Sequence, residues 1–128
     1  MKQEKGFSLI EVAIAIALLG IVAIAFLGGL STASRAIFIA DERATAESLA
    51  RTQMEYVKSQ DYDSDNNPPQ YALIPDIPVG YQIDVIPVRL DPKGDGFAED
   101  DGIQKITVVV EHLEKPEVIK LVGYRSER

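Results

Sequence analysis

From Val12 to Leu30 the chain carries no charged residue. This apolar run lies within residues 7–30, FSLIEVAIAIALLGIVAIAFLGGL, a segment that contains no proline. A helix needs about 20 predominantly apolar residues to cross the hydrocarbon core of a bilayer. The segment is long enough to do so, and we predict a transmembrane helix over residues 7–30.

Positive charge is distributed unevenly around this helix. Lys2 and Lys5 precede it, and the first positive charge after it is Arg35. Because the cytoplasmic flanks of membrane helices are enriched in Lys and Arg, the pattern favours a single pass with a cytoplasmic N-terminus and a translocated body. A secretory signal peptide also joins a basic head to an apolar core, but this apolar run is long for such a core.

Residues 31–60 continue without proline or glycine. Small, apolar and neutral residues recur there at helical spacing along one face: Ala46, Leu49, Ala50, Gln53 and Val57. We therefore predict one helix from about Phe7 to about Ser59, amphipathic over residues 31–60, which would extend on the order of 80 Å. The body after residue 60 is too short to cover such a helix, so its first half must meet a membrane or other copies.

Residues 61–128 have the composition of a small sheet domain. After a polar linker, three segments resemble strands: residues 81–90, 103–112 and 117–124. Pro87 lies within the first, which is therefore expected at a sheet edge or broken there. Residues 91–102 and 114–116 are predicted turns. The expected fold class is α+β, with a long N-terminal helix packed on an antiparallel sheet of three or four strands.

Composition excludes several classes of function. The formal net charge of −7 argues against a nucleic-acid groove, which needs clustered Lys and Arg. The absence of cysteine excludes disulfides, thiolate nucleophiles and cysteine-ligated metals. His112 is the only histidine, and no serine has a partner set for nucleophilic catalysis. We expect the protein not to be an enzyme.

The junction GFSLIEV, residues 6–12, places one carboxylate, Glu11, inside the apolar segment. An ionisable group costs about 2.5–3.5 kcal/mol near the centre of a spanning helix and less near its end, so such a residue marks a functional site by default. A cut between Gly6 and Phe7 would create an α-amino cation one helical turn from Glu11. Glu11 could pair with this amine in its own chain. Between packed copies it could pair with a neighbour's amine and set the docking register, since a wrong register leaves a charge unpaired.

These residues resemble the prepilin N-terminus shared by type IV pilins, type II secretion pseudopilins and competence pseudopilins. The shared pattern is a glycine, then Phe7, then a glutamate at the fifth position after the cut, then an uncharged run. The resemblance is close over about the first 30 residues and looser over the helix continuation and the sheet, where it implies a pilin-like fold.

The resemblance implies roles for three residues. Residues 1–6 would be a leader peptide, with Gly6 the leader residue before the bond that prepilin peptidase cleaves on the cytoplasmic face. Phe7 would become the N-methylated mature N-terminus, and Glu11 would pair with the Phe7 amine during assembly.

The implied function is a structural subunit of a type IV pilus-like filament, or pseudopilus. Its expected partners are other pilin or pseudopilin subunits, prepilin peptidase, an inner-membrane assembly platform and membrane lipid. The subunit would be extracted from the inner membrane for protein secretion, DNA uptake or pilus biogenesis, with its body periplasmic or extracellular. A chain of another class, a permanently anchored extracytoplasmic binding module that does not polymerise, is the alternative.

Departures from major pilins, including the short body after residue 60, favour a pseudopilin or a minor pilin. The chain lacks a C-terminal cysteine pair, and Gly28 and Gly29 stand where many major pilins have a helix-breaking proline. The stretch RTQMEYVKSQDYD, residues 51–63, resembles the helix end of minor pseudopilins of the type II secretion I subunit class.

Two acidic loops are candidate calcium sites. The first alternates Asp61, Asp63 and Asp65 like the start of an EF-hand loop, but its sixth position is Asn66 and its twelfth is Ala72, which do not fit that loop.

The second loop is the better candidate, because pseudopilin bodies sometimes hold calcium between strands, although Lys93 occupies one ligand position. Its candidate ligands are Asp91, Asp95, Glu99, Asp100 and Asp101. The alternative is a solvated acidic turn.

Overall fold

The computed structural model describes residues 6–113 and 115–127, so residues 1–5 of the predicted leader lie outside the described residues. The chain divides into two compact units, Met1–Ala40 and Asp41–Arg128. We describe each by itself. The predicted boundaries of the leader, the membrane part and the amphipathic part remain predictions.

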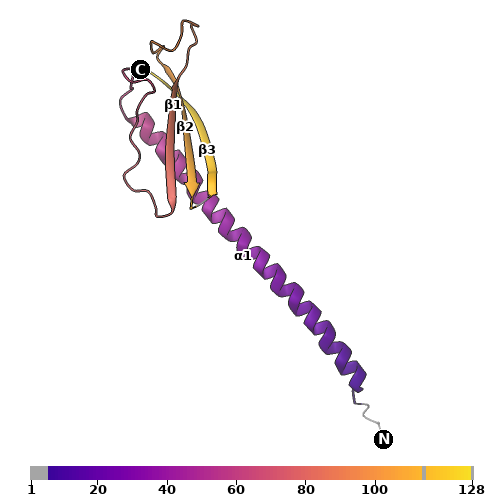
Figure 1. Cartoon of the computed structure of the whole chain (residues 1–128). Helices are drawn as coiled ribbons and strands as arrows, with labels where there is room; N and C mark the ends of the chain where they lie inside the picture. Colours follow the sequence, from indigo (N-terminus) through magenta and orange to yellow (C-terminus); the bar gives the residue numbers. More distant parts are fainter. Residues whose placement is uncertain (1–5, 114, 128) are drawn as a thin grey trace. The chain divides into compact units, whose positions relative to one another are not determined.

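One helix, α1 (Leu9–Ser59), runs through the first unit and into the second (Figure 1). The prediction of a single long helix is confirmed, with a start two residues later than expected. Every residue from Gly6 to Ala40 is exposed. By length and composition, α1 contains a segment apolar enough to cross a membrane. This part of the helix therefore has an apolar surface with no cover from its own unit.

The second unit contains a three-stranded antiparallel sheet in the order β1-β2-β3, with β2 at its centre (Figure 1). The strands are β1 (Tyr81–Arg89), β2 (Ile103–His112) and β3 (Lys115–Ser126). The predicted antiparallel sheet is confirmed with three strands. The expected edge position of Pro87 is also confirmed: β1 is an edge strand, and it continues unbroken with Pro87 opposite Ile106.

The predicted turn at residues 114–116 was wrong in its extent. β3 already begins at Lys115 and includes Pro116, while Glu114 lies outside the described residues. The reversal involves Leu113, which has a positive φ of 52° and donates its N–H to the Gly80 carbonyl at 2.7 Å. Pro116 fits because β3 has no neighbour on its other side, so no ladder bond is lost there.

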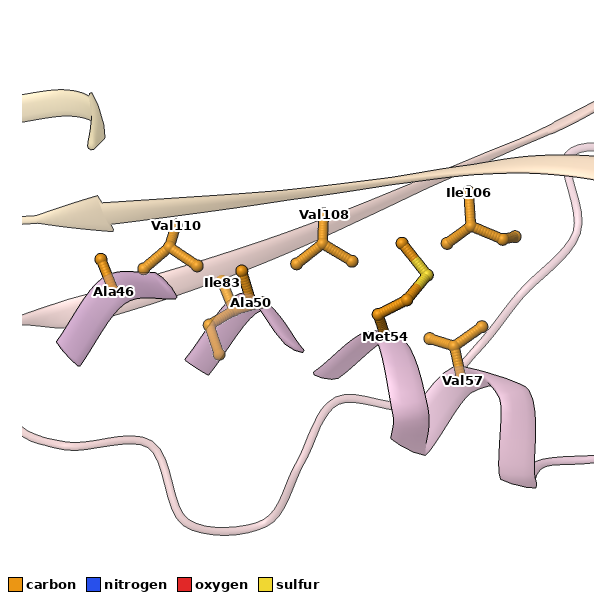
Figure 2. Close-up of a cluster of buried hydrophobic side chains, with 8 residues drawn as sticks. All are labelled: Ala46, Ala50, Met54, Val57, Ile83, Ile106, Val108 and Val110. Atoms are coloured by element: carbon orange, nitrogen blue, oxygen red, sulfur yellow. The ribbon is translucent and has the colours of Figure 1, made fainter. Parts of the chain in front are cut away.

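The hydrophobic core lies between the C-terminal part of α1 and the sheet (Figure 2). It consists of eight buried residues: Ala46, Ala50, Met54, Val57, Ile83, Ile106, Val108 and Val110. The helix face predicted from spacing is confirmed, and Met54 adds to it. A Cβ at Gly123 would lie 3.0 Å from Met54 Sδ, so the missing side chain lets β3 approach the helix closely.

Polar side chains complete the packing at the end of α1. The fully buried Gln53 donates Nε2 to the Ala72 carbonyl at 3.0 Å and accepts the Ile74 N–H at 2.8 Å. Arg125 donates to the carbonyls of Val57 and Gln60, where a cation also interacts favourably with the helix dipole. These bonds join residues 72–74 and β3 to the C-terminal end of α1.

Candidate functional site

The N-terminal junction is built around a helix cap at Ser8. Ser8 Oγ accepts the Glu11 N–H at 3.2 Å, and the Ser8 carbonyl accepts the Val12 N–H at 3.1 Å. Ser8 is thus the N-cap of α1, and its side chain satisfies one of the donors that a helix start leaves free. Our reading of the sequence missed this role, although the pattern Ser-x-x-Glu is a known signal for a helix start.

Phe7 precedes the cap and is 82% exposed. It lines a shallow apolar groove along the helix together with Val12, Ala15 and Leu19. A hydrophobic residue before the cap commonly packs on the fourth helical residue, which here is Val12. Gly6 and Phe7, the predicted processing residues, therefore lie outside the helix and next to its start.

Glu11 lies in the first turn of α1 and is exposed. Within residues 6–113 and 115–127, its carboxylate forms no hydrogen bond or salt bridge, and the other groove residues around it are apolar. The positive end of the helix dipole favours an anion at this position. The structure thus presents a carboxylate on an apolar surface with its acceptor atoms available to a cation from outside.

The acidic loop between β1 and β2 brings together three of the five predicted calcium ligands. One carboxylate oxygen from each of Asp91, Asp95 and Asp101 lies within 4.8 Å of the others. Asp91 also organises the loop backbone, since its carboxylate accepts the N–H groups of Gly94 and Gly96 at 2.7 and 2.9 Å. The bond from the Gly96 N–H is the main reason that the pKa of Asp91 is held below its usual value.

Lys93 competes for this carboxylate cluster. Its Nζ lies 2.9 Å from Asp101 Oδ1, and the Asp101 side chain is only 3% exposed. Three converging carboxylates fit the oxygen ligands that Ca²⁺ prefers, but an ion here would have to displace the Lys93 ammonium. The ion pair with Asp101 is also the main cause that raises the pKa of Lys93.

The other two predicted ligands lie differently. Glu99 is exposed, whereas the Asp100 side chain is only 4% exposed and accepts hydrogen bonds from Tyr62 Oη at 2.5 Å and Gln104 Nε2 at 2.7 Å. Burial would raise the pKa of Asp100, but these bonds, a bond from the Gly102 N–H and the Arg89 charge outweigh it and lower the pKa. Asp100 is therefore already coordinated by the protein's own donors.

Arg89 is the cation of this buried network and was not expected from the sequence. Its Nε lies 3.5 Å from Asp100 Oδ2, and both side chains are at least nine-tenths buried. Its terminal nitrogens donate to the carbonyls of Ser64 and Asn66 from the linker and of Ala98 from the acidic loop. One guanidinium thus holds the two acidic loops together.

Asp63, from the first acidic loop, binds backbone rather than presenting a ligand. It accepts the N–H groups of Asp65, Asn66 and Gln70 at 3.2, 3.1 and 2.7 Å. The Gln70 bond is the largest cause of its lowered pKa. This carboxylate shapes the linker after α1.

The fold and the comparisons define the class of protein. The long helix packed through its C-terminal part on a three-stranded antiparallel sheet is a pilin-like α+β layout. Residues 1–27 match the family model for the prokaryotic N-terminal methylation motif, the signature of type IV pilins and pseudopilins. No curated protein and no solved structure matches the chain significantly.

The motif indicates a type IV pilin-like protein that prepilin peptidase processes. Proteins with this signature are structural, and the motif implies assembly with other pilin subunits. Together with the exposed apolar helix, it indicates a membrane-anchored protein.

Proposed function

We propose that the chain is a subunit of a pseudopilus, a short type IV pilus-like filament assembled from the inner membrane. The observation that carries this proposal is the single carboxylate of Glu11 on the fully exposed part of α1, residues 9–40, inside a prepilin methylation motif. Processing would cut the Gly6–Phe7 bond and methylate the new Phe7 amine. The filament would serve protein secretion, DNA uptake or pilus biogenesis, with this chain as a minor subunit.

The exposed apolar part of α1 supports assembly, because its surface needs a partner both in the membrane and in the filament. Exposed apolar patches larger than a few hundred Å² mark interaction or membrane surfaces. Lipid covers such a surface while the subunit is in the membrane, and neighbouring helices would have to replace the lipid once it leaves. The chain therefore carries a surface suited to both states.

The charge at Glu11 supports a specific register in the assembled state. After cleavage, the Phe7 amine would lie at the positive end of the helix dipole, which disfavours a cation. A Glu11 carboxylate from an adjacent copy would neutralise this amine. In an apolar bundle, a shifted register leaves both charges buried and unpaired, which is strongly destabilising. One acid and one amine per subunit thus suffice to select the docking position.

The test combines processing with assembly in cells that contain the filament machinery. Mass spectrometry of the mature chain should find a methylated N-terminus at Phe7, and filaments should incorporate the subunit. Glu11→Gln should be processed yet lose incorporation by at least tenfold. Glu55→Gln, which neutralises another exposed carboxylate on α1, is the matched control and should assemble normally.

Two outcomes would argue against the proposal. An intact Met1 in the mature protein would favour the permanently anchored binding module instead. Normal incorporation of Glu11→Gln would show that the carboxylate does not select the register.

A further inference from the structure

The backbone changes conformation at Ser8. Gly6, Phe7 and Ser8 are non-helical, and Leu9 is the first residue of α1. The bond cleaved in the proposed function joins Gly6 to Phe7. It therefore lies in non-helical backbone, separated from the helix by Phe7 and the capping residue.

This placement matters because a peptidase needs access to the backbone of the bond that it cuts. Cleavage sites concentrate at exposed chain ends and loop tips. A bond held in a hydrogen-bonded helix is cut through an opened state, so its cleavage depends on how often that state is populated. A helix start that moved toward the leader would thus reduce the cleavable fraction of the chain.

Ser8 is the residue that prevents such a shift. Its hydroxyl accepts the Glu11 N–H at 3.2 Å and favours a start at Leu9. Without that hydroxyl, Gly6 becomes the nearest upstream residue accepted at an N-cap, since glycine is tolerated there and phenylalanine is not preferred. A helix capped at Gly6 would include Phe7 as its first residue. The Gly6–Phe7 bond would then lie at the helix boundary.

The cap also leaves Glu11 free. In a full capping box, the glutamate side chain accepts the N–H of the capping serine. Among the described residues, only the serine half of the box is formed. The hydroxyl therefore satisfies the helix start without occupying the carboxylate.

We propose that Ser8 is a positioning residue for processing: by capping α1, it keeps the Gly6–Phe7 bond outside the helix and available to the peptidase. The inference rests on the proposed function, because it concerns the cleavage step of that function. It assigns Ser8 a role in the substrate's conformation rather than in contact with the peptidase.

The experiment measures cleavage of the full chain in detergent micelles by purified prepilin peptidase, with mass spectrometry of the products. Ser8→Ala should raise KM measurably, by at most about fivefold, and leave kcat unchanged, because loss of a cap shifts the equilibrium away from the cleavable helix start by roughly that factor. Ser8→Asn retains a good cap and should keep KM near the original value.

A second helix-start signal separates conformation from recognition of the hydroxyl. Proline is favoured at the first helical position and disfavours helical backbone in the residue before it. Leu9→Pro should therefore fix the helix start independently of Ser8. The double variant Ser8→Ala/Leu9→Pro should recover the KM of Leu9→Pro alone. Amide hydrogen exchange at Ile10 should be slowed in Ser8→Ala only, because a helix capped at Gly6 supplies the Gly6 carbonyl as the partner of the Ile10 N–H.

Several results would overturn the inference. Unchanged KM in Ser8→Ala would do so, as would a KM defect in that variant with unchanged amide exchange at Ile10. A defect that persists equally in Ser8→Asn and in the double variant would show that the peptidase reads the hydroxyl itself. If Leu9→Pro alone is not cleaved, the amide exchange of Ser8→Ala decides whether the helix start has shifted. An original chain that is never cut at Gly6–Phe7 would instead refute the proposed processing.

Discussion

The two units of this chain handle apolar surface in opposite ways. From Gly6 to Ala40 every residue is exposed, including the large apolar side chains of the helix. In the second unit, the C-terminal part of α1 buries one face against the sheet, and Arg89 and Asp100 form a buried polar network. The second unit has a core of its own, whereas residues 6–40 of the first unit bury none of their apolar side chains. Substitutions should therefore have different consequences in the two units.

The largest expected effect concerns Arg89. Arg89→Ala would leave Asp100 as an uncompensated buried charge and several carbonyls without a donor. Removing one partner of a buried pair costs about 3–5 kcal/mol, which we expect in the free energy of unfolding of the second unit, measured by denaturant titration.

Arg51→Ala is the matched control for this prediction. It removes an exposed helical ion pair with Glu47, and such a pair contributes roughly 0.3–0.5 kcal/mol. Equal losses in the two variants would contradict the importance of the buried network.

Replacing a glycine by alanine should change the stability in opposite directions in the two units. At Gly123 a new Cβ would meet Met54 Sδ at 3.0 Å, whereas at Gly28 nothing lies within 4 Å. Gly123→Ala should therefore cost about 1–3 kcal/mol through overpacking. Gly28→Ala should favour the helix by up to about 1 kcal/mol. Circular dichroism during thermal unfolding in detergent measures both, and destabilisation by Gly28→Ala would indicate a close neighbour at that position.

Calcium binding should act on the second unit alone. If the loop binds Ca²⁺ with a Kd of about 1 mM, typical of weak extracellular sites, 10 mM Ca²⁺ should stabilise this unit by about 1.4 kcal/mol. Asp95→Asn should abolish the shift in Tm, and Lys93→Ala should enlarge it because no ammonium would compete for Asp101. Asp84→Asn, an exposed position on β1 outside the loop, is the control. Absence of any Ca²⁺-dependent shift in the original chain would exclude the site.

The smallest expected effect is a pH dependence from Glu42. Lys115 Nζ lies 3.1 Å and His112 Nδ1 3.0 Å from its carboxylate oxygens. The bond from Lys115 is the largest cause that lowers the pKa of Glu42 below 4.5. Because the folded pKa is depressed, the contribution to stability is present above pH 4.5 and is lost as the pH falls through the folded value.

A comparison with Glu42→Gln measures this contribution. The difference in unfolding free energy between the original chain and Glu42→Gln should shrink as the pH falls from 4.5 to 3. A difference that stays constant over this range would show that the interaction with Lys115 and His112 does not depend on the carboxylate charge.

The sequence predicted the parts of the fold that follow from local patterns. Helical spacing identified the buried face containing Ala46, Ala50 and Val57, and strand-like composition located β1 and β2. The start of β3 was placed too late because proline and charge at Lys115 and Pro116 suggested a turn. The preference of proline for turns misleads there, because the edge strand β3 tolerates Pro116, which has no backbone N–H to donate.

The candidate sites also divide into one that local sequence reveals and one that depends on distant partners. Glu11 stands out in the sequence because a lone charge in an apolar run has no local explanation. Asp100 looked equivalent to its acidic neighbours, since nothing local shows that Tyr62, Gln104 and Arg89 converge on it. Partners far apart in the chain decide which carboxylate is buried and which remains accessible.

The sequence by itself determined a long helix, the lone acid in its apolar first part and the methylation motif around that acid, because hydrophobicity, helical period and charge are properties of neighbouring residues. Only the tertiary structure decided that the helix face packs in one core with Ile106 and Val108. It also decided that Arg89 is buried and joins the two acidic loops. Those outcomes depend on contacts between distant segments, whose geometry exists only once the sheet has packed on the helix.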